Sequence, residues 1–439
     1  MVVGPRNQKR CFSAVLTCCI LLIFFGYQFN AKHFGLSLGT YDDDGRDNLP
    51  GAYLRYLVPS NASHCKFNYG LPEDFIFFDG DTYGSPELGA SSPFRALYHV
   101  VESSSSPELP AVTYATHLTT NFLSYLTEVL RYWDGLVSVA AYVPDGDLRS
   151  IIRQLIHYCY CVPAMSRVSL HFVFRKNVTF KSTLSFNKGP PTSCDIIGGS
   201  PKKTEPPPLI RTNDSWYPVN VCRNVARSAS VSDYVMVSDV ELMPSKELAR
   251  RFMNMIEQSK CPTGRCDKRV YVVPIFEVES TETVPRTKEE LKLLLTAERA
   301  TYFHRHICNH CQRFPGLEVW MESDPGDAIE PFLSVKRETP YHRWEPVYIG
   351  TKSEPFYNEA LSWEGFQDKM PQMLELCLQG YKFVVLDGAF LVHWPGIKKS
   401  NSYYAQWRSR FVEINRRQYD LILKNLSRRY PRKPRCNAN

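Results

Sequence analysis

Apolar runs of strand length alternate with stretches of helical spacing through the middle of the chain. AVTYATHL at 111–118, VSVAAYV at 137–143 and RVSLHFVF at 167–174 are rich in β-branched and aromatic residues, which favour strands. Helical spacing of apolar residues separates them, at 119–132 and at about 146–157. This alternation predicts βαβ units. We therefore expect an α/β fold with a mostly parallel central sheet and helices on both faces.

Later segments extend this pattern, and one polar stretch interrupts it. Buried strands are expected at YVMVSD (234–239), RVYVVPIFEV (269–278) and KFVVLDGAFLV (382–392). NVCRNVARSAS at 220–230 is expected to form a helix before the first of these strands. Residues 186–208 are rich in Pro, Gly, Ser and Lys, which predicts a long surface insertion.

The stretch YVMVSDVELMPS at 234–245 ends a strand on two carboxylates. Asp239 and Glu241 are two positions apart, so in an extended segment their side chains point to the same side. Ligands bind at the carboxyl ends of strands in open α/β sheets, and paired hard oxygen ligands suit Mg²⁺ or Mn²⁺. The pattern is short, and an acidic strand end that faces solvent is the alternative.

A second polar motif follows the strand at 382–392. It reads His393-Trp-Pro-Gly396-Ile-Lys398-Lys399. A histidine can supply a third protein ligand to Mn²⁺, a glycine allows close approach of the backbone, and a lysine can hold a diphosphate as a point charge. A lone histidine at a strand end is usually structural, but its combination with D-x-E favours a metal–nucleotide site.

These motifs resemble the site of GT-A glycosyltransferases, which carry D-x-D and often a C-terminal H-x-x-G-x-x-K. Here the latter reads His393, Gly396 and Lys399. From about residue 110 to 436 the chain resembles family 49 glycosyltransferases. The stretches that carry the resemblance are 114–143, YPVNVCRNVARSASVSDYVMVSDVELMPS at 217–245, VYVVPIFEVE at 270–279, 288–312, RWEPVYIG at 343–350, GYKFVVLDGAFLVHWPG at 380–396 and RYPRKPRC at 429–436.

The resemblance implies a Golgi type II membrane enzyme with a GT-A fold, Mn²⁺ (or Mg²⁺) and a UDP-sugar donor. It implies inverting transfer to a glycoprotein glycan of the O-mannosylation pathway, with other Golgi glycosyltransferases as candidate partners. Glucuronic acid, β-1,4 to xylose, is the first donor expected, and N-acetylglucosamine in β-1,3 linkage is the second. Two alternatives remain: a weakly catalytic, glycan-binding homologue, and a zinc-stabilised lumenal binding module built on the Cys/His cluster.

The resemblance also implies roles for individual residues. The expected metal ligands are Asp239, Glu241 and His393. Asn224 and Arg227 form an N-x-x-R motif on the predicted helix, and a surface helix with an ordinary arginine is the alternative. The residues expected at the nucleotide-sugar are Thr116, His117, Asn224, Arg227, Gly396 and Lys399.

Inverting transfer needs a general base for the acceptor hydroxyl. The segment at 358–370 offers Glu359, which matches the acidic position of the family, together with Glu364 and Asp368. Each of the three is a candidate, and each is otherwise a solvated loop carboxylate.

Trp344 and Glu345 are expected on the acceptor side, where an aromatic face can stack on a sugar; a core tryptophan is the alternative. The sequence also departs from the family pattern. Glu241 stands where the second Asp of D-x-D is usual, and the loop around Asp368 lacks arginines that the family carries. Both departures bear on donor choice and catalytic strength.

The N-terminus carries an uncharged apolar run at 11–29, which is long enough to span a bilayer. Arg6, Lys9 and Arg10 precede it, so the positive-inside rule predicts a cytoplasmic tail and a lumenal remainder. A cleaved signal peptide is the alternative. The expected division is a tail at 1–10, an anchor at 11–29, a lumenal stem at 30–106 and a GT-A catalytic domain at 107–436.

Glycosylation sequons and cysteines fit a lumenal location. The sequons start at Asn61, Asn177, Asn213 and Asn425. The chain has fourteen cysteines, and three of them lie at the anchor. Disulfides are expected among the other eleven, and because eleven is odd, at least one thiol stays unpaired within the chain. The cluster from His304 to Cys311 has the residue types of a zinc site, but disulfides are favoured there.

The charge of the chain is mildly basic. Its formal net charge of +7 is spread along the sequence, and no Lys/Arg block is interleaved with aromatic residues. This distribution argues against a nucleic-acid partner.

Overall fold

The computed structural model describes residues 49–104, 106–144, 147–178, 184–186, 189–195, 216–259, 268–399 and 402–436. The expected anchor, the sequon at Asn213, Cys261, Cys266 and most of the expected insertion lie outside these residues. Among the helices that the structure describes, none combines the length and the apolar character needed to cross a membrane.

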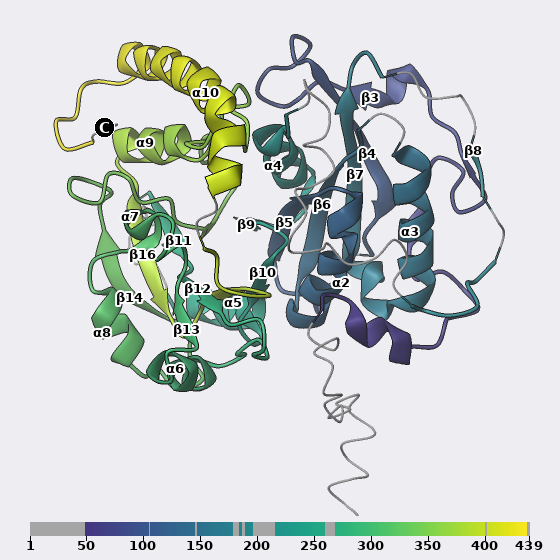
Figure 1. Cartoon of the computed structure of the whole chain (residues 1–439), viewed down its shortest axis with the longest axis horizontal. Coiled ribbons are helices and arrows are strands. Elements are labelled where there is room, and N and C mark those ends of the chain that lie inside the picture. The colour runs from purple at the N-terminus through teal and green to yellow at the C-terminus, as the bar shows by residue number, and fades with distance from the viewer. Residues whose placement is uncertain are drawn as a thin grey trace, which may run out of the picture. The chain divides into compact units, whose positions relative to one another are not determined.

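A large mixed sheet of eleven strands forms the centre of the described chain (Figure 1). Its order is β1-β4-β7-β6-β5-β9-β15-β11-β16-β14, with β3 beside β4. The strands are β1 Lys66–Phe67, β3 Thr82–Tyr83, β4 Phe94–Glu102, β5 Val112–Leu118, β6 Leu136–Tyr142, β7 Val168–Arg175, β9 Tyr234–Val237, β11 Arg269–Val272, β14 Glu330–Val335, β15 Tyr348–Gly350 and β16 Lys382–Asp387.

Only part of this sheet is parallel. Strands β7, β6, β5 and β9 are parallel neighbours, as are β11 and β16, whereas the remaining pairs are antiparallel. The expectation of a mostly parallel sheet is therefore wrong outside the β7-β6-β5-β9 block and the β11–β16 pair. Expected α/β layering is confirmed, because helices cover both faces of that block.

Every residue of β5 and β6 is buried, since each face of these strands meets a helix layer. Tyr114 and Leu118 of β5 pack in the core cluster that includes α2 (Leu123–Tyr132) and α3 (Leu148–Cys161). Ala115, between them, packs against α4 (Val219–Ala229) on the other face. Alternation along β5 thus places His117 on the α4 side and Thr116 on the opposite side.

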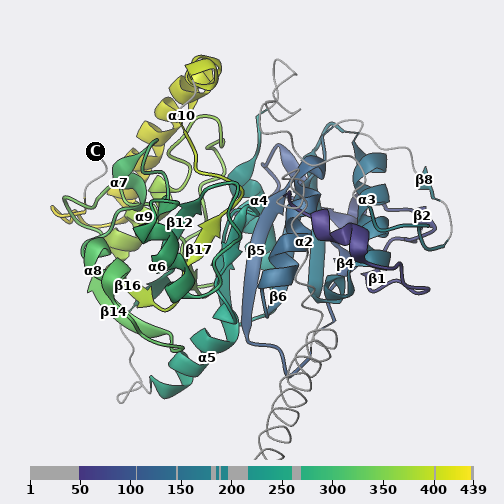
Figure 2. The same cartoon turned by 60° about the horizontal axis from the view of Figure 1, so that its bottom comes forward.

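A second sheet of four strands lies beside the large one, and Figure 2 shows its strands β12 and β17 together. Its order is β10-β17-β12-β13, with β10 antiparallel and β12 parallel to β17. The strands are β10 Leu242–Pro244, β12 Ile275–Val278, β13 Ala300–Tyr302 and β17 Leu391–His393; two short strands elsewhere, β2 Asp74–Phe75 and β8 Leu184–Ser185, pair with each other.

Two of the expected strands are each divided between the two sheets. The apolar run at 269–278 breaks after Val272, close to Pro274, which has no backbone N–H for a ladder. The run at 382–392 breaks at Gly388, which has φ +72°, and a Cβ there would lie 2.1 Å from the carbonyl oxygen of Ala328. Only glycine fits this turn.

Further helices cover the C-terminal half of the chain. Helices α9 and α10 pack together through an apolar cluster that includes Leu361, Leu374 and Ile422. The remaining helices are η2 Ala52–Tyr56, η3 Asp79–Asp81, η4 Thr120–Phe122, η5 Pro163–Arg167, α5 Leu248–Gln258, α6 Lys288–Thr296, α7 Asn309–Gln312, α8 Leu317–Glu322, α9 Met370–Gln379 and α10 Ser402–Arg429.

Within the described residues, four disulfides confirm the expectation of disulfide pairing. They join Cys65–Cys159, Cys161–Cys194, Cys308–Cys311 and Cys377–Cys436, while Cys222 is a buried thiol.

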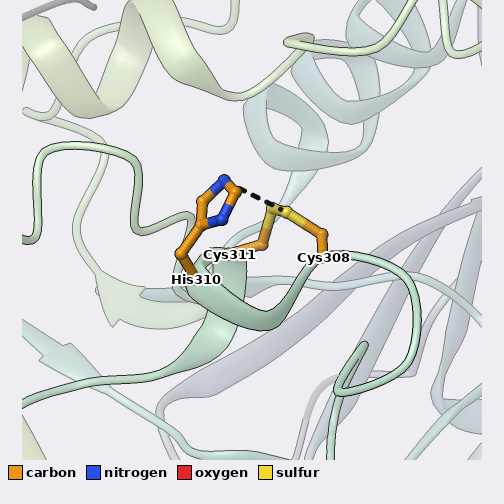
Figure 3. Close-up of side chains that lie close together, drawn as sticks. All are labelled: Cys308, His310 and Cys311. Carbon is orange, nitrogen blue, oxygen red and sulfur yellow. Dashed lines mark hydrogen bonds between the residues drawn. A yellow bond between two sulfur atoms is a disulfide. The ribbon is translucent and has the colours of Figure 1, made fainter.

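The Cys/His cluster from His304 to Cys311 contains a disulfide between Cys308 and Cys311. His310 lies beside it, with Nε2 3.4 Å from Cys308 Sγ (Figure 3). A sulfur that is bonded to another sulfur is not a thiolate ligand, so this arrangement favours the structural interpretation of the cluster over a zinc site.

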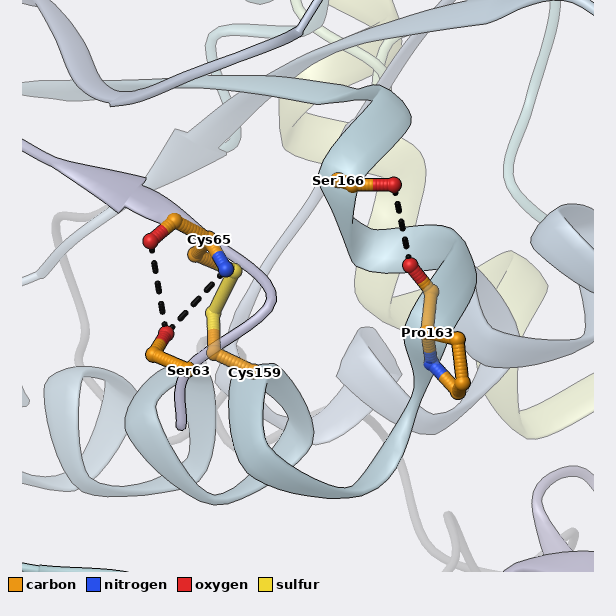
Figure 4. The surroundings of a disulfide bond; sticks show 5 residues. All are labelled: Ser63, Cys65, Cys159, Pro163 and Ser166. Carbon is orange, nitrogen blue, oxygen red and sulfur yellow. Dashed lines mark hydrogen bonds between the residues drawn. A yellow bond between two sulfur atoms is a disulfide. The ribbon is translucent and has the colours of Figure 1, made fainter. Parts of the chain in front are cut away.

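The stem expected at 30–106 is wrong for its described residues. β4 pairs with β7 in the large sheet, and Gly51 N–H donates to Glu128 Oε1 of α2 at 3.0 Å. Cys65 is tied to Cys159 of α3, and the hydroxyl of Ser63 braces the Cys65 backbone (Figure 4). The folded unit therefore starts well before residue 107. Residues 30–106 are polar overall, so the sequence did not predict strand β4, whose apolar residues are buried.

Candidate active site

The two carboxylates of D-x-E lie on a turn between the two sheets. β9 ends at Val237 and β10 begins at Leu242, so Asp239 and Glu241 flank a turn rather than share one extended strand. The hydroxyl of Tyr114 lies 2.9 Å from the Asp239 carbonyl oxygen and 2.8 Å from that of Leu242, which fixes the turn. Both residues line one pocket, and their sharing of one cation stays a prediction.

Asp239 is held by cationic and hydrogen-bonding groups from three elements. Its Oδ1 accepts from His117 Nε2 at 3.1 Å and from Arg223 Nη2 at 3.2 Å, and its Oδ2 lies 3.9 Å from Lys369 Nζ. Burial raises the pKa of Asp239, but Lys369, His117 and Arg223 outweigh burial and hold that pKa well below its ordinary value. The carboxylate is ionised.

Glu241 faces His393 because β10 and β17 are paired in register, Leu242 opposite His393. His393 Nε2 lies 3.8 Å from one Glu241 oxygen, and Lys398 Nζ lies 3.6 Å from the other. Burial raises the pKa of Glu241, but Lys398 and His393 lower it overall to about 2. Glu241 is therefore also ionised.

The tautomer of His393 leaves one nitrogen available. Its Nδ1–H donates to the carbonyl oxygen of Gly396 at 3.0 Å, and Gly396 has φ +93°, a conformation that favours glycine. His393 Nε2 is buried and, within the described residues, has no hydrogen-bond partner. Burial, then Lys398, lowers the pKa of His393, so the ring is neutral with its Nε2 lone pair toward Glu241.

These three side chains offer the donor types that a divalent cation takes, but within the described residues their ligand atoms do not all lie within 4.8 Å of one another, as those of Cys308, His310 and Cys311 do. Asp239 and Glu241 supply ionised hard oxygens, and His393 supplies an oriented imidazole whose second nitrogen is already fixed by a backbone carbonyl. Such a donor set suits Mn²⁺ or Mg²⁺ together with phosphate oxygens and water.

The helix α4 contributes Arg223 instead of the two residues expected from it. Asn224 bonds Tyr357 and the Glu359 carboxylate, and Arg227 donates to backbone carbonyls of the 351–355 loop. Both side chains are buried, so the structure does not bring Asn224 or Arg227 to the pocket. They clamp the loop at 351–359.

Of the other residues expected at the nucleotide-sugar, His117 lines the pocket, but Thr116 and Lys399 do not. Thr116 is fully buried on the far side of β5, whereas His117 lines the pocket and accepts from the Tyr217 hydroxyl at Nδ1 (2.8 Å). Lys399 is exposed, and Lys398 is the lysine of the motif that lines the pocket.

Glu277 is a pocket neighbour that the sequence analysis missed. It lies opposite His393 in the β12–β17 pair, and its carboxylate accepts from the backbone N–H of His304 (3.2 Å) and of Lys398 (3.3 Å). Burial raises the pKa of Glu277 to about 7. A glutamate inside the apolar run IFEV was the available signal.

The structure separates the three candidate bases. Glu364 lines the pocket; its Oε1 accepts from Tyr217 N–H at 2.9 Å, and its buried Oε2 has no partner among the described residues. Glu359 lies outside the pocket lining and bonds Asn224, and Asp368 is paired with Arg223. Burial raises the pKa of Glu364. Glu364 is therefore the carboxylate best placed to take a proton.

The two expected acceptor residues divide in the same way. Trp344 is 1% exposed and packs between Phe314 and Phe383, so it is a core residue and the acceptor role predicted for it is wrong. Glu345 is partly exposed. Burial, and then the charge of Asp368, raises the pKa of Glu345 to about 7. Glu345 is thus close enough to the Arg223–Asp368 pair to be affected by the charge of Asp368.

Three of the four predicted glycosylation positions can be located. Asn61, Asn177 and Asn425 are exposed, and Asn425 lies on α10. Asn213 lies outside the described residues. Whether any of them carries a glycan stays a prediction.

Arg223→Met is expected to lower the free energy of unfolding by about 3–5 kcal/mol. The Arg223 side chain is 2% exposed and bridges Asp239 and Asp368; burial lowers its pKa, but the two carboxylates outweigh this and raise it overall. Without the guanidinium, Asp239 and Asp368 both lose the ion pair that they make with Arg223. Denaturant unfolding of the two proteins measures the difference.

The exposed Arg250 of α5 provides the control. Arg250→Met should change the unfolding free energy by less than about 0.5 kcal/mol. Equal effects of the two substitutions would show that Arg223 is not a structural bridge.

Comparison with known families shows the family to which this chain belongs. A model of the family described as a glycosyl-transferase for dystroglycan, glycosyltransferase family 49, matches residues 111–431. The chain belongs to family 49. The resemblance found in the sequence is thereby confirmed, and all residues of the pocket described above fall within the family 49 match.

Family 49 relatives include beta-1,4-glucuronyltransferase 1 of Danio rerio, which is 28% identical over 368 residues and covers 79% of this chain and 82% of the relative. The Homo sapiens protein of that name is 26% identical, with 79% and 82% covered. Xylosyl- and glucuronyltransferase LARGE2 of Mus musculus is 26% identical over 66% of this chain, which spans 35% of that relative.

A solved structure aligns more distantly. It is S. aureus TarS 1–349 in complex with UDP, at 10% identity and a TM-score of 0.33, with 69% of this chain and 70% of TarS covered. A score of this size does not establish a common fold.

Proposed function

We propose that this family 49 protein is a Mn²⁺-dependent, inverting glycosyltransferase that uses UDP-glucuronate. The observation that carries the proposal is the arrangement of His393, whose Nδ1–H is fixed by Gly396 and whose Nε2 faces Glu241 without a hydrogen bond. The names of the relatives support glucuronic acid as donor. A GT-A fold is consistent with the mixed α/β sheet.

Asp239, Glu241 and His393 would hold the divalent cation. When bound, the cation would offset the negative charge that develops on the UDP leaving group. Lys398, at the same edge of the pocket, supplies a mobile positive charge for a diphosphate. Because Glu241 already pairs with Lys398, phosphate oxygens would compete for that lysine.

Glu364 would take the proton of the acceptor hydroxyl. Its Oε1 is fixed by Tyr217 N–H, and the hydroxyl of the same tyrosine orients His117, which donates to Asp239. One short chain of hydrogen bonds therefore positions both the base and the first carboxylate of D-x-E. Attack from the side opposite the leaving group gives inversion.

The cellular setting belongs to the same proposal. We place the protein in the Golgi membrane as a type II enzyme anchored by residues 11–29. Its acceptor would be a xylose-terminated glycan on an O-mannosylated glycoprotein, in line with the family description.

The test is UDP release by the full-length protein, expressed in mammalian cells and solubilised in detergent. Mn²⁺, a xylose-terminated acceptor and a panel of UDP-sugars are supplied. Release with UDP-glucuronate, abolished by chelation of the metal, is expected. Release with UDP-N-acetylglucosamine would overturn the donor, and the absence of both release and UDP binding would overturn the proposal.

A further inference from the structure

A tryptophan lies in the same pocket as the proposed base, directly before it in the chain. Trp363 is 38% exposed and lines the pocket with Asp239, Glu241 and Glu364. An indole that is exposed at a pocket lacks the complete burial that a structural tryptophan usually has. Trp344, which is 1% exposed, shows the contrast.

The position of Trp363 is fixed by α10. Arg408 donates from Nε to the Glu364 carbonyl oxygen at 2.8 Å and from Nη2 to that of Trp363. Asn415 bonds the backbone of Ser362 and Phe366 on either side. A loop whose backbone is held in this way from a helix can preorganise its side chains for binding.

Arg408 also limits which part of the indole is available. Its guanidinium lies 4.2 Å from the centre of the Trp363 ring, so it covers one face. The opposite face of the indole is not covered by Arg408, and Trp363 lines the pocket. Aromatic surfaces beside a few convergent polar groups are typical of small-ligand sites.

We propose that Trp363 is the platform on which the terminal sugar of the acceptor stacks. This inference rests on the function proposed above. The apolar C–H face of a pyranose matches the free part of the indole, and the adjacent Glu364 can then meet a hydroxyl at the edge of the same ring. The platform and the base are consecutive residues, so one backbone segment sets the distance between them.

Trp363→Ala is expected to raise the KM for a xylose-terminated acceptor about tenfold or more, which corresponds to the loss of one good ring contact. The KM for the UDP-sugar should change less than about twofold, because donor and acceptor bind different parts of the pocket. Trp363→Phe should recover most of the acceptor affinity. Steady-state kinetics with each substrate varied in turn measures the split.

Phe366 supplies the matched control. It lies on the same loop, is 46% exposed and also contacts Arg408, at 3.9 Å, but it does not line the pocket. Phe366→Ala should leave the acceptor KM within about twofold. An equal rise in both variants would show that Trp363 acts by supporting the loop and would overturn the platform.

Failure of the proposed function can be told apart from failure of the platform. If the unaltered protein releases no UDP with any donor, the function fails, and calorimetric binding of the xylose-terminated oligosaccharide to the unaltered protein and to Trp363→Ala still tests the platform. Weaker binding to the variant supports Trp363. Equal binding, like an unchanged acceptor KM in the active enzyme, overturns it.

Discussion

Glu241→Gln should reduce Mn²⁺-dependent sugar transfer by about 10³-fold. The amide keeps the shape of the side chain but removes the charge that Lys398 and His393 hold ionised, with a pKa of about 2. A neutral amide is a poor replacement for one of two carboxylate ligands to a hard cation. UDP release at increasing Mn²⁺ concentration, together with direct Mn²⁺ binding, measures the loss.

Two further variants make this result specific. Glu241→Asp keeps the charge and converts D-x-E to the usual D-x-D, so transfer should remain within about tenfold of the unaltered protein. Glu279→Gln removes an exposed carboxylate just after β12 and should change nothing. Full activity of Glu241→Gln at saturating Mn²⁺ would show that Glu241 is not a ligand.

Glu364→Gln should lower kcat by about 10²–10⁴-fold, the usual contribution of a positioned base, while UDP binding persists. Glutamine keeps the oxygen that accepts from Tyr217 N–H but cannot take a proton. Burial raises the pKa of Glu364 above its ordinary value. The base must be ionised, so activity should fall as the pH drops through that raised pKa, and the variant should lose this limb of the pH profile.

Glu359 is the matched control for the base. It lies on the same loop, is 2% exposed, and burial raises its pKa to about 8, yet it bonds Asn224 and Glu87 outside the pocket lining. Glu359→Gln should therefore keep kcat within about twofold. If Glu359→Gln lost activity and Glu364→Gln kept it, the assignment of the base would be reversed.

Residue type and spacing predicted the central part of the fold and the site. Buried runs at β5, β6, β7 and β9 are continuous in the sequence, so their length and composition identify them. Asp239, Glu241 and His393 stand at the ends of such runs, which is why the sequence could bring them together. Their roles as metal ligands stay predictions.

The sequence could not predict which residues of helix α4 face the pocket. Asn224 and Arg227 lie on the α4 face that holds the 351–359 loop, and Arg223, one position earlier, reaches Asp239. Neighbouring positions on a helix differ by about 100° in direction, and only tertiary packing selects between them. Lys398 and Lys399 after Gly396 present the same one-residue ambiguity.

The division of strands between two sheets was equally hidden. Pro274 and Gly388 interrupt apolar runs that read as single strands, and each break transfers the chain from the large sheet to the small one. β4 was missed because its polar surroundings resembled a stem. Pairing with a distant partner, β7, decides its structure, and such pairing is not encoded locally.

The clamp of α10 on the loop at 362–366 has a consequence for biosynthesis. His393 and the clamping residues Arg408 and Asn415 all come from the last 50 residues of the chain, whereas His117 and Asp239 emerge much earlier. Domains tend to fold from the N-terminus during synthesis, so the large parallel block can form before these parts exist. A chain that ends before His393 would lack the His393 imidazole and the hydrogen bonds by which α10 holds the loop of Glu364. We expect such a chain to be partly folded but to have no transferase activity.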